Sequence, residues 1–163
     1  LGTMGYGLPA AVGVQIAHPD KLVIDIAGEA SVLMTMQEMS TAVQYKLPIK
    51  IFILNNQYMG MVRQWQELLH EKNYSESYTA ALPDFVKLAE AYGCVGIQAT
   101  KPDELDEKIN EMINTKEPVI FDCRVDPAEN CFPMIPSGKP HNQMLLGPED
   151  EKEEVSDEGK TLV

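Results

Sequence analysis

Two asparagines follow a strongly apolar stretch near the middle of the sequence, and their side chains are of a type that can bind a metal ion. Residues 51–54 read Ile-Phe-Ile-Leu, the pattern of a strand buried on both faces, and Asn55 and Asn56 come directly after it. An earlier apolar stretch ends in the same way, at Gly-Glu-Ala-Ser, residues 28–31. A carboxylate such as Glu29 and an amide oxygen such as Asn56 are the hard ligands that Mg²⁺ prefers.

The elements that must position these residues alternate along the chain. Strand patterns cover residues 21–27, 47–55, 95–100 and 118–126, and helix patterns cover residues 5–17, 31–45, 60–71, 83–93 and 102–114. Pro83-Asp84 and Gly93 are typical of a helix start and a helix end. This alternation predicts an α/β fold, a parallel sheet flanked by helices on both faces.

Ligands of such folds bind beyond the carboxyl ends of the strands, and both polar groups follow strand ends. If the two strands are neighbours, Glu29 and Asn56 lie side by side. Gly28, Ala30 and Ser31 then open a helix, whose N–H groups favour a phosphate. This pattern indicates a metal-bridged diphosphate. The alternative is two ordinary loops, with asparagine as a turn former and Ser31 as a helix cap.

The composition of the chain argues against two classes of partner, nucleic acids and membranes. The chain has 163 residues, a net charge of −12 and 44% hydrophobic residues. Such a size allows one domain with a sizeable core, and the negative charge argues against a nucleic-acid partner. No apolar stretch approaches the ~18 residues of a membrane span, so we expect no membrane partner either.

The ends of the chain and its cysteines add further expectations. Residues 149–163 hold seven acids and two lysines, so we divide the chain into a domain, residues 1–147, and an acidic, disordered tail, residues 148–163. Because the sequence begins at Leu1 without a signal-like segment, we expect it to belong to a longer protein. Three cysteines without a CxxC pattern favour reduced thiols and a cytoplasmic, bacterial-type location.

One competing motif points to a nicotinamide cofactor. Gly5, Gly7 and Ala10 fit the dinucleotide fingerprint, and Asp25 follows Gly5 by 20 residues. However, no strand pattern precedes Gly5, and Asp25 lies inside a predicted strand rather than after it. The confirming context is therefore mostly missing.

Several longer motifs carry a resemblance to a known family. GEAS followed by NN resembles the GDG…NN motif of thiamine-diphosphate enzymes. Together with GTMGYGLPAAVG, VIDIAGEAS, NNQYMGMVRQW, PDFVKLAEAYG and PMIPSG, it resembles the C-terminal cofactor domain of the acetolactate synthases, over residues 1–147. The resemblance implies the thiamine-diphosphate-binding fold.

The resemblance assigns roles to individual positions. It implies metal binding by Glu29, by the side chain of Asn56 and by the backbone carbonyl of Tyr58. The positions that it places against the cofactor are Gly2, Met4, Gly28, Ala30, Ser31, Asn56, Gly60 and Met61. Trp65 and Ser137 match positions that line the substrate channel.

Bland alternatives stand beside these roles. Met4 could be plain core, Trp65 could pack a helix against the sheet, and Ser137 could be part of a turn. The histidines at 18, 70 and 141 lack metal spacing and are expected at the surface.

The family has aspartate where this chain has Glu29, and the extra methylene matters because Mg²⁺ demands near-ideal geometry. Weaker binding, or a larger ion, would follow.

The implied activity needs more than this chain. In the family, a pyrimidine-binding domain of a partner subunit supplies the activating glutamate, so we place no catalytic residue here. The resemblance implies thiamine diphosphate and Mg²⁺ as cofactors, with FAD in the full-length enzyme. It also implies 2-oxoacid substrates on the route to branched-chain amino acids, a homo-oligomer and a possible regulatory subunit. The alternatives are another thiamine-diphosphate carboligase or decarboxylase, or a non-catalytic binding or assembly module.

Overall fold

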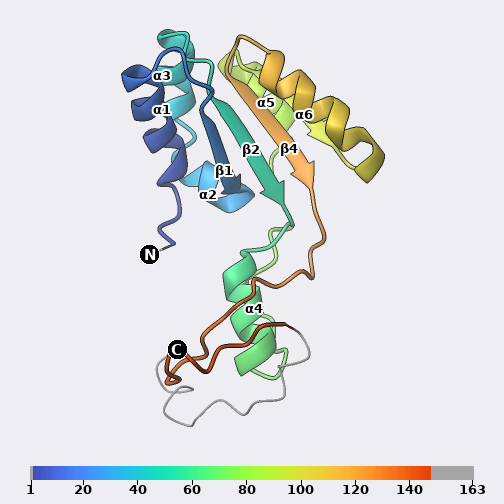
Figure 1. Ribbon diagram of the computed structural model, residues 1–163. Helices are drawn as coiled ribbons and strands as arrows, with labels where there is room; N and C mark the ends of the chain where they lie inside the picture. The colour runs from blue at the N-terminus through green and yellow to red at the C-terminus, as the bar shows by residue number, and fades with distance from the viewer. Residues whose placement is uncertain (1, 148–163) are drawn as a thin grey trace. The chain divides into compact units, whose positions relative to one another are not determined.

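A parallel four-stranded sheet forms the centre of the fold in the computed structural model, which describes residues 2–147 (Figure 1). The strands are β1 (Ile24–Gly28), β2 (Lys50–Asn55), β3 (Val95–Ala99) and β4 (Val119–Arg124). Their order is β1-β2-β4-β3, and each neighbouring pair is parallel. The sequence prediction of a parallel sheet is therefore confirmed.

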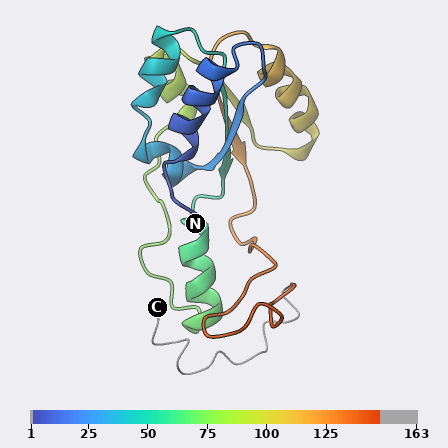
Figure 2. The ribbon, with the colours of Figure 1, turned by 60° about the vertical axis from the view of Figure 1, so that its left-hand side comes forward.

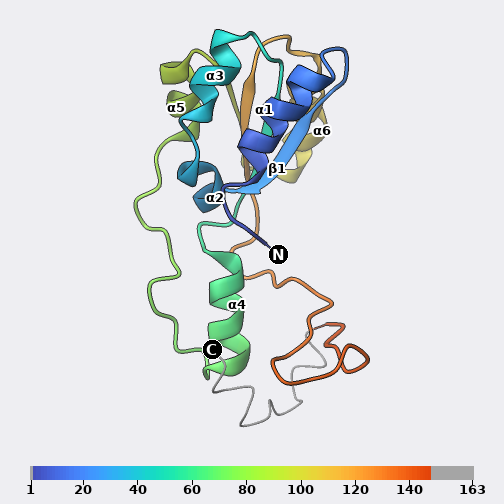
Figure 3. The same cartoon turned by 90° about the vertical axis from the view of Figure 1, so that its left-hand side faces the viewer.

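Helices cover both faces of this sheet, as predicted. One core lies between the sheet and α1 (Gly7–Ala17), α2 (Glu29–Met34), α3 (Glu38–Gln44) and α5 (Phe85–Tyr92). A second core joins β3 and β4 to α6 (Leu105–Asn114), which follows the short 3₁₀ helix η1 (Pro102–Glu104). Figures 2 and 3 show α6 on the opposite side of the sheet from α1 and α3.

The described residues divide into two compact units. The first consists of the residues up to 57 and residues 80–127, and it holds the sheet and its helices. The second consists of residues 58–79 and the residues from 128 onward, and it holds α4 (Gly60–Leu69). The predicted acidic tail, residues 148–163, lies outside the described residues.

Local capping signals locate α5 accurately. The Asp84 carboxylate accepts hydrogen bonds from the backbone N–H groups of Val86 and Lys87, both at 3.1 Å. Gly93 ends the helix with a φ of 83°, a left-handed conformation that glycine adopts without a steric cost. Both ends can be predicted from the sequence because the capping residues directly flank the helix.

The predicted helix over residues 31–45 is wrong in one respect, since it is broken into α2 and α3. Thr35 leaves the helical conformation, and its hydroxyl donates a hydrogen bond of 3.1 Å to the Gly5 carbonyl oxygen. The cap assignment of Ser31 is also wrong. Gly28 is the N-cap residue of α2, and Ser31 lies inside the helix.

In the part of the chain that the structure describes, no helix is both long and apolar enough to cross a membrane.

Candidate functional site

Glu29 and Asn56 follow the carboxyl ends of two strands that are direct neighbours. Gly28 of β1 pairs with Leu54 of β2, so Glu29 and Asn56 leave the sheet at the same edge and within the same compact unit. Glu29 is the first residue of α2 and is only 1% exposed, while Asn56 is half-buried. The sequence prediction that these two groups meet at one strand edge is consistent with this register.

The N-terminal segment that contains Gly2 and Met4 is tied to α2 by two hydrogen bonds. The Gly5 N–H donates to the Ser31 hydroxyl oxygen at 2.8 Å, and the Gly5 carbonyl accepts from Thr35. These bonds bring the first residues of the chain to the helix that begins at Glu29. Met4 is 40% exposed, so the alternative of a plain core residue is wrong.

Gly5 and Gly28 lie near α2, and the lack of a side chain matters for a different physical reason at each of them. A Cβ on Gly5 would lie 3.1 Å from the Met34 Cβ, and its φ of 80° disfavours any other residue. A Cβ on Gly28 would meet no atom within 4 Å. Gly5 is therefore needed for close packing of the segment on α2, whereas the space in front of Gly28 is open to a ligand.

The donor set fits a magnesium–diphosphate complex better than a metal held by protein alone. Among residues 2–147, no group of three or more His, Cys, Asp or Glu side chains could hold a metal ion. Mg²⁺ usually takes one or two protein ligands and completes its octahedral shell with phosphate oxygens and water. The Glu29 carboxylate and the Asn56 amide oxygen are ligands of this kind, and the open space at Gly28 leaves room for the phosphates.

In the second unit, α4 carries the remaining cofactor candidates. The segment before the helix pairs with residues 77 and 78, because the Met59 N–H donates to the Ser77 carbonyl at 2.8 Å and Tyr58 forms a bridge with Tyr78. Gly60 and Met61 are the first two residues of α4. N–H groups in the first turn of a helix have no acceptor within the helix, so they are suited to contact an anion.

A buried arginine fixes α4 within its unit. Arg63 is 4% exposed and forms an ion pair with Glu67, one turn further along the helix. Its guanidinium also donates to the Ala128 carbonyl at 2.8 Å and to the Asn130 side chain. This network holds one side of the helix against residues 128–130.

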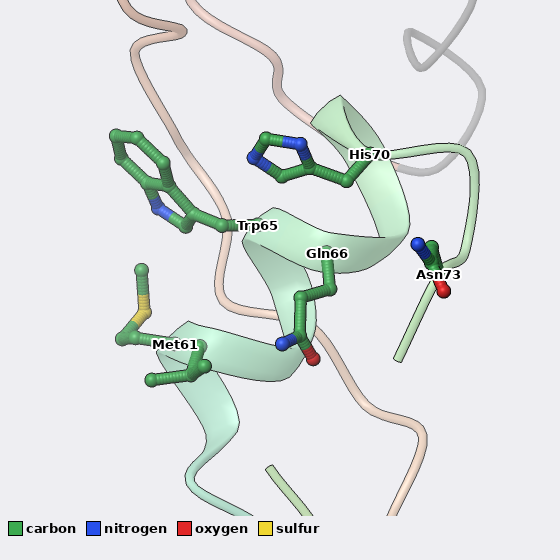
Figure 4. Close-up of a pocket in the computed structure, with 6 residues that line it drawn as sticks. Met61, Trp65, Gln66, His70 and Asn73 are labelled. Atoms are coloured by element: carbon green, nitrogen blue, oxygen red, sulfur yellow. The ribbon is translucent and has the colours of Figure 1, made fainter. Parts of the chain in front are cut away.

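The other side of α4 lines a hollow of about 550 Å³. Met61 and Trp65 project from the same side of the helix, as Figure 4 shows. Trp65 is half-buried, and it lies in the unit that holds α4. The full lining consists of Met61, Val62, Trp65, Gln66, His70 and Asn73.

Ser137 is half-buried in a loop of the same unit and does not belong to this lining. Sequence reasoning found Met61 and Trp65 but missed the other residues around the hollow. The i+3 and i+4 spacing that joins Val62 to Trp65 and Gln66 was the signal that could have found Val62 and Gln66, whereas His70 and Asn73 follow the end of α4 and carry no such signal. His70 and His18 are exposed, as expected for surface histidines.

The dinucleotide alternative does not fit the structure. Asp25 lies within β1 and is 7% exposed, and a Cβ on Gly7 would collide with its carboxylate. The carboxylate thus faces the start of α1 rather than a ribose. Within the described residues, the first strand begins at Ile24, after the helix that the fingerprint should open.

The fold and the strand-end site therefore define a class of protein. Residues 1–123 match the family described as thiamine pyrophosphate enzyme, C-terminal TPP binding domain, and the chain belongs to this family.

Relatives within the class are acetolactate synthase large subunits. The chain is 53% identical over 146 residues to that of Cyanidium caldarium, covering 89% of this chain and 25% of the relative. It is 47% identical to the isozyme 3 large subunit of Escherichia coli, with 90% and 26% covered. It is 48% identical to the mitochondrial catalytic subunit of Saccharomyces cerevisiae, with 95% and 23% covered. The chain thus spans about a quarter of the length of these relatives.

A solved structure of the same class has a similar fold. The thiamine diphosphate-dependent 4-hydroxybenzoylformate decarboxylase of Rhodococcus jostii RHA1 matches with a TM-score of 0.70 and 32% sequence identity. The match covers 76% of this chain and 23% of that chain.

Proposed function

We propose that this chain is the cofactor-binding domain of an acetolactate synthase, which condenses pyruvate with a second 2-oxoacid. The observation that carries the proposal is the placement of Glu29 and Asn56 directly after the ends of adjacent parallel strands. The identities of 44–53% to acetolactate synthase large subunits support this particular synthase. The remaining three quarters of such an enzyme would supply the activating glutamate, the flavin site and the subunit contacts.

Each candidate residue has a task in this proposal. Glu29, Asn56 and the Tyr58 carbonyl would hold Mg²⁺, and the metal would hold the diphosphate. When bound, thiamine diphosphate supplies an electron sink for decarboxylation of the 2-oxoacid. The backbone positions proposed to bind the diphosphate are Gly28, Ala30, Ser31, Gly60 and Met61.

The remaining candidates would orient the ring of the cofactor and admit the substrate. Met4, exposed next to α2, would support the bent form of thiamine, and the Gly2 carbonyl would accept from the aminopyrimidine. Trp65, with Met61 beside it on α4, would contact the substrate. Ser137 lies outside the lining of that hollow, and we assign it to the substrate channel on the family resemblance alone. The partner in this proposal is the pyrimidine-binding domain of a second subunit.

A second candidate is another enzyme of the same class. The similarity to the Rhodococcus jostii decarboxylase, at 32% identity, favours a thiamine-diphosphate decarboxylase or carboligase as that candidate. The proposed Glu29–Asn56 metal site is the same in both cases. Product analysis of the full-length protein, with pyruvate as the only substrate, separates the two candidates.

Glu29 provides the test of the metal site. We expect Glu29→Asp to tighten Mg²⁺-dependent binding of thiamine diphosphate, because the shorter carboxylate restores the family's geometry. Glu29→Ala should remove the metal dependence, because Asn56 and a carbonyl offer no charge to offset Mg²⁺. Asn56→Ala should weaken binding while leaving the carboxylate in place. The measurement is calorimetric titration of thiamine diphosphate with and without Mg²⁺, in the full-length synthase that we propose contains this chain.

If Glu29 is instead only an acid in the first turn of α2, Glu29→Ala costs ~0.3–1 kcal/mol of helix stability and leaves metal affinity unchanged. Equal metal dependence in the wild type and in Glu29→Ala would remove Glu29 from the site.

A further inference from the structure

Asp122 is a buried carboxylate for which the proposed function has no task. It lies in β4 and is 1% exposed. Its Oδ1 accepts a hydrogen bond of 2.7 Å from the Asn55 amide, and its Oδ2 accepts one of 2.8 Å from the Gln98 amide. The Arg124 guanidinium forms an ion pair with it at 3.5 Å. Side chains from β2, β3 and β4 thus converge on one carboxylate.

Asn55 connects this carboxylate to the turn that follows β2. The Asn55 side-chain oxygen accepts a hydrogen bond of 3.2 Å from the Gln57 N–H. Gln57 has a φ of 62°, a left-handed conformation that non-glycine residues rarely adopt. Asn56, the proposed metal ligand, lies between the two residues that this bond joins.

The charge of Asp122 decides which way the Asn55 amide points. An ionised carboxylate only accepts hydrogen bonds, so it faces the NH₂ end of the amide. The oxygen end is then directed to the Gln57 N–H. An apolar residue at position 122 would leave the buried amide free to turn, and it would leave the turn without this restraint.

We propose that Asp122 is a positioning residue that acts through Asn55 to fix the turn at residues 55–57 and, with it, the metal ligand Asn56. This inference rests on the proposed function, because it assigns Asn56 to the metal. It also accounts for the pair of asparagines: Asn56 binds the ion, and Asn55 holds the backbone that presents it.

The first measurement needs neither metal nor cofactor. In this chain, we expect Asp122→Ala to raise the hydrogen-exchange rate of the Gln57 amide about tenfold or more, the worth of one lost hydrogen bond to a charged group. Met112→Ala is the matched control, since Met112 is a buried residue of α6 in the second core, to which Asn55, Gln98 and Asp122 do not belong. It should change Gln57 exchange only as far as it changes exchange throughout the sheet.

The second measurement is the Mg²⁺ dependence of thiamine diphosphate binding. In the full-length synthase, Asp122→Ala and Asn55→Ala should raise the Mg²⁺ concentration for half-maximal thiamine diphosphate binding about tenfold. Met112→Ala should leave that concentration unchanged even where it lowers stability.

A polarity swap gives the strictest test. Asn55→Asp alone places two carboxylates next to each other, which repel. It should therefore raise the Mg²⁺ concentration for half-maximal binding more than Asn55→Ala does. Adding Asp122→Asn lets the new amide donate to the new carboxylate, which still accepts from the Gln57 N–H, while the amide oxygen accepts from Gln98. Arg124 lies opposite position 55 in the strand register and remains beside the charge. We expect the double variant to recover Mg²⁺ half-saturation to within about threefold of the wild type.

The outcomes separate the two proposals. An unchanged Mg²⁺ half-saturation in Asp122→Ala, with metal dependence lost in Glu29→Ala, overturns the positioning role and leaves the proposed function standing. Unchanged metal dependence in both Glu29→Ala and Asn56→Ala overturns the metal site and the positioning role with it. If Asp122→Ala does not fold, the swap decides alone: recovery supports the positioning role, and no recovery overturns it.

Discussion

Two buried acidic residues of the first unit show how the surroundings give the same chemical group different tasks. Glu29 lies at a strand end beside open space, where a ligand can compensate its charge. Asp25 is the second residue of β1 and is packed against Gly7 of α1. Burial raises the pKa of the Asp25 carboxyl, because the charged form loses hydration there. Asp25 therefore weakens the folded state when it ionises.

This assignment predicts a pH-dependent gain for Asp25→Asn. Below the unfolded-state pKa of ~3.9, Asp25 is protonated in both the folded and the unfolded state. In that range its burial has little effect on the difference in stability between Asp25→Asn and the wild type. As the pH rises through the raised folded-state pKa, the unfolded chain ionises more readily, so the wild type loses stability. The stability of Asp25→Asn relative to the wild type should therefore increase from about pH 4 and level off above the folded-state pKa. Urea unfolding at a series of pH values measures it.

A difference in stability between Asp25→Asn and the wild type that stays flat with pH would contradict the effect of burial.

At the scale of elements, the contact of α5 with β3 depends on Gly96. A Cβ at this position would lie 2.8 Å from the Cα and the carbonyl oxygen of Val86, which are backbone atoms and cannot turn away. We expect Gly96→Ala to lower the free energy of unfolding by about 1–3 kcal/mol, because the helix must move off the strand.

Gly13→Ala is the matched control. Gly13 lies inside α1, and an added Cβ there meets no atom within 4 Å. This substitution should stabilise the chain by about 0.5–1 kcal/mol, because alanine favours a helix interior. Urea unfolding measures both variants, and equal effects of the two would contradict the packing argument.

The elements also show which parts of this fold can be predicted from sequence. The caps of α5 and the apolar pattern of β2 are local signals, so the sequence locates both. The break between α2 and α3 follows from the contact of Thr35 with Gly5, which lies 30 residues away. No local pattern predicts such a contact.

The same distinction holds at the candidate site. Glu29 and Asn56 are predictable because residues that follow neighbouring parallel strands share an edge. The convergence of Asn55, Gln98 and Asp122 is not, because it requires β4 to lie between β2 and β3. That order is non-sequential, and it brings together residues that are 24 and 67 positions apart.

At the scale of the whole molecule, one face of the sheet is only partly covered. Ile24 and Ile26 of β1 are 41% and 68% exposed, and they lie on the face where α6 packs. The core under α6 joins β3, β4 and Phe52 and does not reach β1. In this respect the described residues differ from a doubly covered sheet, in which every strand is buried on both faces.

The last prediction concerns the activity of the chain alone. We expect it to make no detectable acetolactate from pyruvate, even with thiamine diphosphate, Mg²⁺ and FAD, because in our proposal the activating glutamate belongs to a pyrimidine-binding domain outside this sequence. A colorimetric acetolactate assay measures it, with the complete Escherichia coli isozyme 3 subunit in the same mixture as a positive control. Product from this chain above the cofactor-only blank would contradict the prediction and would require an activating group among its own residues.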